Sequence, residues 1–373
     1  MELEREPTAE QKDIVYLQAE LEKTHFDLYR NVSEQVLTDS LQKATEVEPE
    51  YFGIAIQESL ALVRDAHTCV QGILNDNILP IALKEIDGYF YIIGSSKEYS
   101  HLLGQKLQNI NGYKLIKLVE KISNLSSKEN SETLKKDLAM DMVSNKVLKY
   151  YGFSSSENLQ ITTDKGTNEV IIDTQAKIKP LKPLRWKASE INDPTFIGNS
   201  IYRSRMVGDT LLFQYNSCTN EDHKEEELQN FKNNLLQFVK TSKTVIVDLR
   251  ENRGGDTSVM GDLFEKFPDN KEIYVVMGRK TFSSAMHHML YLKKKKNAIL
   301  IGENAGQKPN RFGDNKKIKL PNSKININCS YKYFELLPGQ NIDAIEPDIK
   351  IPVTIEDYMN KTDPLNKWIK DNL

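Results

Sequence analysis

The sequence is poor in cysteine and has no long apolar run. Of its 373 residues only three are cysteine, Cys69, Cys218 and Cys329. They are far apart and odd in number, which excludes a disulfide framework and a cysteine-based metal site. No apolar stretch approaches the roughly 20 residues that a membrane-spanning helix needs. We therefore expect no membrane span in this chain.

An excess of charge of one sign is also lacking. The chain has 50 Lys and Arg residues against 53 Asp and Glu residues, a formal net charge of −3. Because nucleic-acid-binding domains are usually basic, we expect no nucleic acid among the partners. The opening sequence MELEREPTAEQ contains no apolar signal core. Either the protein is cytoplasmic or a leader was removed before this chain begins.

The first half of the chain divides into a helical part and a β-rich part. Residues 1–75 are predicted to form an N-terminal helical domain, which begins with a capping-box pattern at Thr8 and Gln11. Residues 76–195 are predicted to be an intermediate region of short strands, with a hairpin signal at Asp87-Gly88. Prolines punctuate a predicted linker near 178–200.

Residues 196–373 alternate strand and helix patterns and are predicted to form an α/β catalytic core. The apolar run TVIVDLR is typical of a buried parallel strand. The fold class is therefore α/β with a largely parallel sheet. Ligand sites in such sheets lie at the carboxyl ends of the strands. Three segments leave predicted strand ends, namely 248-DLRENRGGD-256, 278-GRKTFSSA-285 and 302-GENAGQKPNRFGD-314.

The segment GRKTFSSAM places Ser283 and Ser284 at the start of a predicted helix. A serine there lies near the positive end of the helix dipole and beside free N–H groups that could stabilise an oxyanion. Taken alone, however, serine at a helix start most often acts only as an N-cap. The paired Gly254 and Gly255 permit either a tight turn or a close approach to a ligand.

Three histidines are candidates for chemistry, and two of them are weak candidates. His287 and His288 are adjacent on the predicted helix, so they point about 100° apart and cannot easily serve one metal or one serine. No HExxH pattern accompanies them, and we expect neither a metal nor another cofactor. His67 lies in 65-DAHT-68, where an apolar helix ends. Periodicity alone does not distinguish a structural role from a catalytic one.

Several segments, in order along the chain, together resemble the S41 peptidases, the tail-specific or C-terminal processing protease family with its tricorn-like relatives. The family pattern DGHT appears as 65-DAHT-68, and the pattern IDLRxNxGG appears as 247-VDLRENRGG-255. The remaining matches are 281-TFSSA-285, 302-GENAGQKPNRFG-313, 347-PD-348 and 356-EDYMNKTDP-364. The resemblance therefore covers nearly the whole chain.

The resemblance implies both a fold and a set of site residues. The family core is crotonase-like, as in ClpP and crotonase, with an N-terminal helical region and a β-rich PDZ-like module. Ser283 falls on the family's nucleophile, and His67 falls on the base of the tricorn-like serine–histidine branch. The N–H of Ser284 and a glycine N–H of Gly254 or Gly255 would form the oxyanion hole.

The sequence also departs from the family pattern. Ala66 replaces the glycine of DGHT, Met286 replaces a glutamate, and GEPTGG has become GENAGQ with Gln307 in place of a glycine. The lysine of the serine–lysine branch falls on Lys308, which is an alternative base or a substrate anchor. The acidic residue that orients the histidine follows the nucleophile in relatives, and the candidates are Glu335 and Asp343.

We therefore predict a serine endopeptidase that cleaves peptides or unfolded protein segments by acyl transfer. The alternative is a catalytically weak or inactive protease-derived protein that binds a peptide or another ligand, and the two altered motif loops motivate it. An acyl-CoA enzyme fits the sheet, but it fits neither the serine at the helix start nor the DAHT segment. Relatives are often bacterial envelope or secreted proteins, so we expect that compartment, with the cytoplasm as the alternative.

Overall fold

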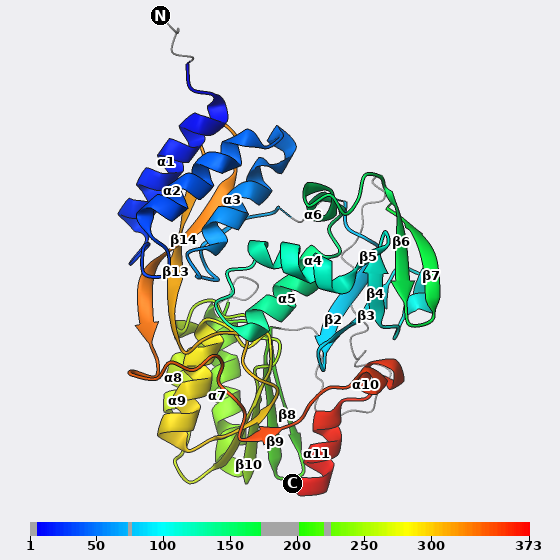
Figure 1. The fold of residues 1–373 in the computed structure, drawn as a ribbon. Helices are drawn as coiled ribbons and strands as arrows, with labels where there is room; N and C mark the ends of the chain where they lie inside the picture. Colours follow the sequence, from blue (N-terminus) through cyan, green and yellow to red (C-terminus); the bar gives the residue numbers. More distant parts are fainter. Residues whose placement is uncertain (1–5, 74–76, 173–200, 220–224) are drawn as a thin grey trace, which may run out of the picture. The chain divides into compact units, whose positions relative to one another are not determined.

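The computed structural model describes residues 6–73, 77–172, 201–219 and 225–373. The chain forms two compact units, each with its own core (Figure 1). The first unit contains Met1–Pro183 and Asn310–Glu335, and the second contains Leu184–Pro309 and Leu336–Leu373. The predicted linker near 178–200 lies outside the described residues. The predicted domain boundaries at 75 and 195 stay a prediction, and the segment 310–335 is grouped with the first unit.

The helical part of the first unit consists of α1 (Ala9–Thr24), α2 (Glu34–Lys43) and α3 (Phe52–Ala61). The predicted capping box is present, because Thr8 and Gln11 each bind the other's main-chain N–H. The apolar faces of these helices pack on a three-stranded antiparallel sheet with the order β1-β14-β13. Figure 1 shows the three helices beside β13 and β14.

This sheet joins segments that are far apart in the sequence. Its strands are β1 (Cys69–Val70), β13 (Asn310–Lys319) and β14 (Asn326–Glu335), and Cys69 pairs with Asn328. The sequence patterns did not predict the pairing of β1 with β14. The pairing gives the apolar faces of α1–α3 a surface on which to pack.

The β-rich part of the first unit has two further sheets. Its strands are β2 (Ile81–Ile86), β3 (Tyr89–Ser95), β4 (Leu107–Ile110), β5 (Tyr113–Lys114), β6 (Asn158–Thr163) and β7 (Gly166–Ile171). Strands β2 and β3 form a hairpin around Asp87-Gly88, as predicted, and the other four have the order β5-β4-β6-β7. The helices α4 (Leu115–Ile122), α5 (Ser131–Asp141) and α6 (Asn145–Tyr150) share their core.

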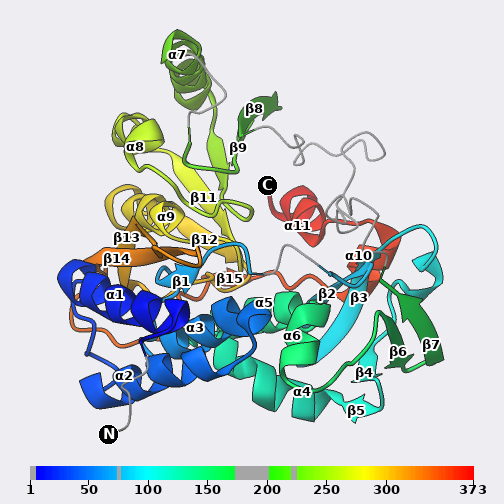
Figure 2. The ribbon, with the colours of Figure 1, turned by 90° about the horizontal axis from the view of Figure 1, so that it is seen from above.

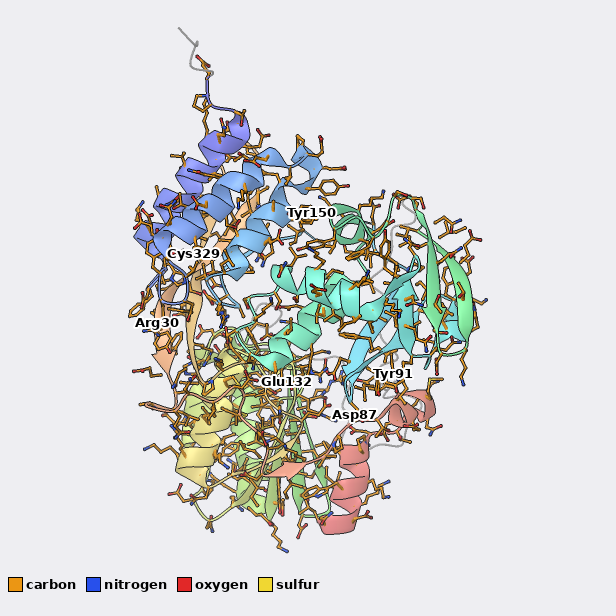
Figure 3. All side chains as sticks on the ribbon, viewed as in Figure 1. Arg30, Asp87, Tyr91, Glu132, Tyr150 and Cys329 are labelled. Atoms are coloured by element: carbon orange, nitrogen blue, oxygen red, sulfur yellow. The ribbon has the colours of Figure 1, made fainter. Side chains whose placement is uncertain are left out.

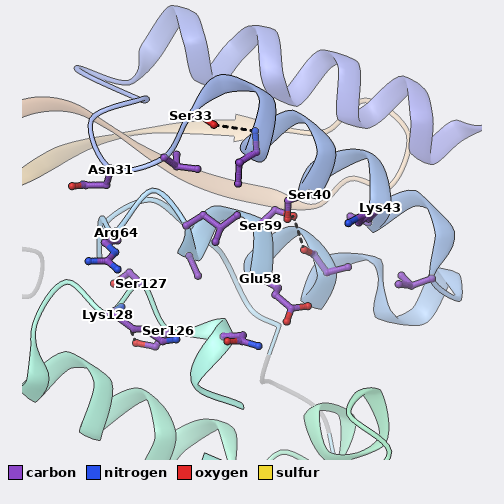
Figure 4. Close-up of a pocket in the computed structure, with 18 of the residues that line it drawn as sticks. Asn31, Ser33, Ser40, Lys43, Glu58, Ser59, Arg64, Ser126, Ser127 and Lys128 are labelled. Carbon is purple, nitrogen blue, oxygen red and sulfur yellow. Dashed lines mark hydrogen bonds between the residues drawn. The ribbon is translucent and has the colours of Figure 1, made fainter. Parts of the chain in front are cut away.

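A polar contact connects the helical and β-rich parts within the first unit. The hydroxyl of Tyr150 in α6, a residue labelled in Figure 3, donates a hydrogen bond of 2.8 Å to the Glu58 carboxylate of α3. Figure 4 shows a groove of about 810 Å³ beside this contact, between α2 and α3 on one side and the loop 124–128 on the other. None of the predicted site residues lines this groove.

The second unit is built on a six-stranded sheet with the order β15-β12-β11-β10-β9-β8. Its strands are β8 (Tyr202–Val207), β9 (Thr210–Tyr215), β10 (Thr244–Asp248), β11 (Glu272–Met277), β12 (Ile299–Gly302) and β15 (Ile349–Lys350). All neighbouring pairs are parallel except β8 with β9. The predicted largely parallel sheet is confirmed, and the loops after β10, β11 and β12 leave its carboxyl edge.

Helices cover both faces of this sheet (Figure 2). One face packs against α7 (Glu225–Thr241), α8 (Ser258–Glu265) and α9 (Ser284–Lys296). The other packs against α11 (Pro364–Asn372), which follows α10 (Ile355–Asn360). The half-buried Arg250 guanidinium fixes the start of α11 by donating hydrogen bonds to Asp248 and, at 2.8 Å, to Asp363. In the described part of the chain no helix is long and apolar enough to cross a membrane.

Candidate active site

The serine turn, residues 278–284, connects the buried strand β11 to α9. Thr281 shapes this turn, because its hydroxyl donates to the Leu249 carbonyl at 2.9 Å and accepts the Gly278 N–H at 3.0 Å. Ser283 follows with φ 50° and ψ −121°, a conformation that is rare for a residue with a side chain. Although Ser283 is at the N-cap position, its side chain makes no capping hydrogen bond to α9. The simple N-cap interpretation is therefore wrong.

The glycine loop, residues 249–257, follows β10 and packs against the serine turn. Gly254 has φ 95°, and a Cβ atom there would lie 2.6 Å from Ser283 Cβ and 2.8 Å from Ser284 N. Only glycine fits this position without displacing the backbone of the turn. The structure therefore brings Gly254, Gly255, Ser283 and Ser284 together, as the sequence motifs predicted.

Asn252 holds the glycine loop and the serine turn together. Its buried side-chain amide donates to the Tyr215 carbonyl at 3.0 Å and accepts the Gly254 N–H at 2.9 Å. Its main-chain carbonyl accepts the Phe282 N–H at 3.1 Å. Asn252 is part of the motif VDLRENRGG, but the sequence predicted no role for it. An asparagine two residues before paired glycines was the available signal, since its short amide can bond its own loop.

Two main-chain donors beside Ser283 are available to an oxyanion. The Gly254 N–H already binds Asn252, and the Ser284 hydroxyl donates to the Gly255 carbonyl. Among the described residues, no acceptor is found for the N–H of Gly255 or of Ser284. The first of these lies in the glycine loop and the second at the start of α9, where helix N–H groups lack partners.

The loop after β12 contributes Gln307 and Lys308. The Gln307 side chain is buried, and its Oε1 accepts the main-chain N–H of Ser283 at 2.9 Å. Lys308 comes directly after it and is half-buried. Neither a role as a base nor one as a substrate anchor follows from this position, so the role of Lys308 stays a prediction.

The adjacent histidines of α9 differ in environment. His288 is buried between the rings of Tyr215 and Phe264, and burial lowers its pKa to about 4. His287 is half-buried. His288 is thus a core residue. This agrees with the sequence analysis, which gave His288 only a weak case for a catalytic or metal-binding role.

His67 lies in the first unit, in a buried group that we call the histidine cluster, namely His25, Asp65, His67 and Thr68. The Asp65 carboxylate accepts hydrogen bonds from the His67 main-chain N–H at 2.8 Å, the Thr68 hydroxyl at 2.5 Å and His25 Nε2 at 3.3 Å. Asp27 donates its N–H to His25 Nδ1, so Nε2 carries the hydrogen. His25 therefore donates to Asp65 as a neutral imidazole.

The electrostatics of the cluster keep His67 neutral. Burial lowers the pKa of His67 to about 4, although the charge of Asp65, whose Oδ1 lies 4.0 Å from His67 Nδ1, acts in the opposite direction. Burial raises the pKa of Asp65, but hydrogen bonds, first of all that from His25, outweigh it and lower the pKa overall. At neutral pH an uncharged imidazole can accept a proton beside an ionised carboxylate.

Two carboxylates of the first unit lie near His67, those of Asp65 and Glu129, and Asp65 Oδ1 is 4.0 Å from His67 Nδ1. Of the predicted acidic residues, Glu335 is exposed at the end of β14, and Asp343 is exposed in the second unit. Their predicted role in orienting His67 stays a prediction. Ser283 belongs to the second unit and His67 to the first, so their pairing also stays a prediction.

Three groups near His67 could in principle coordinate a metal. Asp65, His67 and Glu129 offer ligand atoms that lie within 4.8 Å of one another. However, Asp65 already accepts three hydrogen bonds, and the Ala66 N–H binds Glu129 at 3.0 Å. The buried Arg311 guanidinium is also electrostatically coupled to Glu129. The carboxylates of Asp65 and Glu129 thus already have hydrogen-bond donors or a positive charge as partners.

Solved structures share the architecture of the whole chain. Mature CPAF superposes with a TM-score of 0.61 at 14% sequence identity, over 97% of each chain. The fold is that of CPAF. A point mutant of CPAF gives a TM-score of 0.63 at 14% identity over 98% of each chain. A candidate peptidase from Parabacteroides merdae gives 0.50 at 12% identity, over 97% of this chain and 96% of that one.

The likeness to CPAF is visible in the fold and not in overall sequence comparison. No protein-family profile matches the chain, and no curated protein sequence matches it. These structures confirm the mixed α/β fold that the sequence predicts. They also confirm, as a likeness of fold, the resemblance that the motifs indicate.

Proposed function

We propose that the chain is an S41-type serine peptidase that cleaves peptides or unfolded protein segments by acyl transfer. One observation carries the proposal: Ser283 sits at φ 50° on a strand-to-helix turn, packed against Gly254 and directly before Ser284, the first residue of α9. A strained serine at a strand-to-helix turn, next to main-chain donors, is the arrangement of a hydrolase nucleophile. The shared fold with CPAF supports the same proposal.

In the proposed reaction Ser283 Oγ attacks the carbonyl carbon of the scissile peptide bond, while His67 Nε2 takes the hydroxyl proton. The negative charge that forms on the carbonyl oxygen is stabilised by the N–H groups of Ser284 and Gly255. The protonated His67 then gives its proton to the leaving amine. Water, activated by the same histidine, releases the acyl group from Ser283.

We assign the role of orienting His67 to Asp65 ahead of Glu335 and Asp343. Asp65 is buried, lies 4.0 Å from His67 Nδ1, and is itself held by His25 and Thr68. A negative charge there favours the imidazolium that forms during the reaction. Nδ1 therefore faces Asp65, and Nε2 is left for the nucleophile.

The finer family features belong to the same proposal. The sheet of the second unit would be the crotonase-like core, and the β-rich part around β4 and β5 would be the PDZ-like module. Such a module holds an extended peptide by strand addition. We further propose a bacterial envelope or secreted location, with the cytoplasm as the alternative.

The test is labelling by a fluorophosphonate probe, followed by mass spectrometry to find the modified residue. We expect the full-length chain to be labelled at Ser283 and the Ser283→Ala variant not to be labelled. Ser284→Ala should keep labelling at a reduced rate, because it loses only the hydroxyl bond to the Gly255 carbonyl. Modification of Ser284 instead would reassign the nucleophile, and no labelling of the wild type would favour a ligand-binding protein without turnover.

Lactacystin offers an independent test, since a solved structure of mature CPAF is complexed with it. We expect prior incubation with lactacystin to block fluorophosphonate labelling of Ser283. Unchanged labelling at saturating lactacystin would show that the likeness to CPAF does not extend to this ligand.

A further inference from the structure

The loop after β12 is docked on the serine turn by its main chain. The Gly306 N–H donates to the Thr281 carbonyl at 3.1 Å. A Cβ atom at Gly306 would lie 2.0 Å from the Arg279 carbonyl oxygen, so only glycine allows this approach. On the far side of Gly306, the Ala305 N–H donates to the Ile345 carbonyl at 3.0 Å. These contacts place the next residue, Gln307, at the base of the turn.

Gln307 uses this position to bind the nucleophile's own main chain. Its side chain is fully buried, and its amide oxygen accepts the Ser283 N–H at 2.9 Å. A residue in a rare backbone conformation keeps it only when its surroundings determine it. The hydrogen bond that the Ser283 N–H donates to Gln307 restrains rotation about the N–Cα bond of Ser283, and thus the direction of its side chain.

We propose that Gln307 is a positioning residue that holds Ser283 in its reactive orientation by accepting the Ser283 N–H. This inference rests on the proposed role of Ser283 as nucleophile. It also separates the main-chain N–H groups of the site into those that hold the loops and those that could bind the oxyanion. The N–H groups of Ser283 and Gly254 are used internally, by Gln307 and Asn252, so the oxyanion is left to Ser284 and Gly255.

The proposal gives a function to a departure from the family pattern. A glycine at position 307, as in the pattern GEPTGG, has no side chain that could accept the Ser283 N–H. The substitution that motivated the hypothesis of an inactive protein therefore adds a support beneath the nucleophile. A displacement of the attacking atom by about 1 Å is enough to slow a reaction about 100-fold.

The test compares Gln307→Met with the wild type, because methionine has a similar volume and no strong acceptor. We expect the maximal rate of fluorophosphonate labelling at Ser283 to fall about 10- to 100-fold per folded molecule. The probe concentration at half-maximal rate should stay near the wild-type value. A role confined to stability would instead lower the melting temperature and leave this rate unchanged, and that outcome would overturn the proposal.

Hydrogen exchange measures the bond itself without any activity. In peptides that cover residues 280–286, the Ser283 amide should exchange faster in Gln307→Met than in the wild type. Equal exchange would overturn the proposal. Since this measurement needs no labelling, it also separates the two hypotheses: an unlabelled wild type contradicts the proposed function, while the exchange rate still decides whether Gln307 holds the Ser283 N–H.

Two further variants complete the design. Gln307→Asn keeps a polar group but withdraws the acceptor by about one bond length, roughly 1.5 Å, so it should also label more slowly. This variant replaces Gln307→Met in the test if the methionine variant does not fold. Labelling and exchange rates in Gln307→Asn that equal those of the wild type would overturn the proposal. Gln237→Met, on the exposed surface of α7 in the same unit, is the control and should label at the wild-type rate.

Discussion

The serine turn and the histidine cluster are held in place by different means. The turn is fixed by hydrogen bonds to its main-chain groups at the carboxyl edge of a parallel sheet, where Gly254, which lacks a side chain, can touch Ser283. The cluster is fixed by side chains, because Asp65 is bound by His25 and Thr68 in a buried environment. Contacts of the first kind leave a motif in the sequence, whereas those of the second kind connect residues with no fixed spacing.

Because of this difference, the two regions should be sensitive to different kinds of change. The serine turn should respond to changes in backbone shape and volume, and the histidine cluster should respond to changes in charge and pH. The variants that follow test the two halves separately.

The largest effect is expected at the proposed base, His67. His67→Ala should reduce peptide turnover at least about 1,000-fold, because no group then takes the Ser283 proton. Lys308→Ala should mainly change KM, as expected for a half-buried residue beside the site. Turnover of both variants on one peptide substrate decides between them. Near-normal kcat in His67→Ala with collapse in Lys308→Ala would assign the protein to the serine–lysine branch.

The backbone half is tested by adding a single methyl group. Gly254→Ala should slow labelling of Ser283 at least about 100-fold, because the new Cβ would lie 2.6 Å from Ser283 Cβ. Gly261→Ala on α8 is the matched control, since its Cβ would meet nothing closer than His288 Cε1 at 4.0 Å. It should label normally and be as stable as the wild type or more so. Equal labelling of both variants would refute the proposed packing.

The electrostatic half is tested by removing one charge. Asp65→Asn should lower kcat about 10- to 100-fold, because the imidazolium of His67 loses its carboxylate partner. The charge of Asp65 raises the pKa of His67 against burial, which holds it at about 4. The base is active when neutral, so wild-type labelling should rise with pH through about 4. In the variant this rise should move to lower pH.

The pH dependence of labelling also discriminates between the candidate acidic residues. Glu335→Gln and Asp343→Asn should leave the rise where it is in the wild type, because both side chains are exposed. A larger loss of kcat in either of these variants than in Asp65→Asn would return the orienting role to that residue.

The smallest effect concerns stability in acid, through the core histidine of the second unit. Burial lowers the pKa of His288 to about 4, below its usual value of 6.5. The stability of the neutral form is therefore fully present above pH 6.5 and declines as the pH falls toward 4, by up to about 3 kcal/mol. His288→Leu should show a smaller decline in the free energy of unfolding between these pH values. His101→Gln, at an exposed histidine, should follow the wild type.

The sequence predicted the second unit well because its signals are local. The run TVIVDLR forms the buried strand β10, and the glycine motif and TFSSA form the loops that pack on each other. Apolar runs and glycines report the conformation of their own segment. The S41 resemblance then indicated which of these loops to consider together.

The contacts of the first unit could not be predicted in this way. The Ser330 N–H binds the Thr68 hydroxyl across a separation of 262 residues, and β1 has only two residues. Such pairings depend on the folded sheet and leave no periodicity in the sequence. Gln307 was noticed only as a departure, because its partner is a main-chain N–H that any residue at position 283 would offer.

The path of the chain through the first unit has a consequence for synthesis on the ribosome. The strands β13 and β14 belong with the N-terminal helices, yet they are translated after β12 of the second unit. At typical elongation rates, the partner of Thr68 emerges some tens of seconds after Thr68 itself. The surroundings of His67 are therefore completed only after β14 has been translated. In the proposed peptidase, the serine turn would thus be translated before the environment of the proposed base is complete.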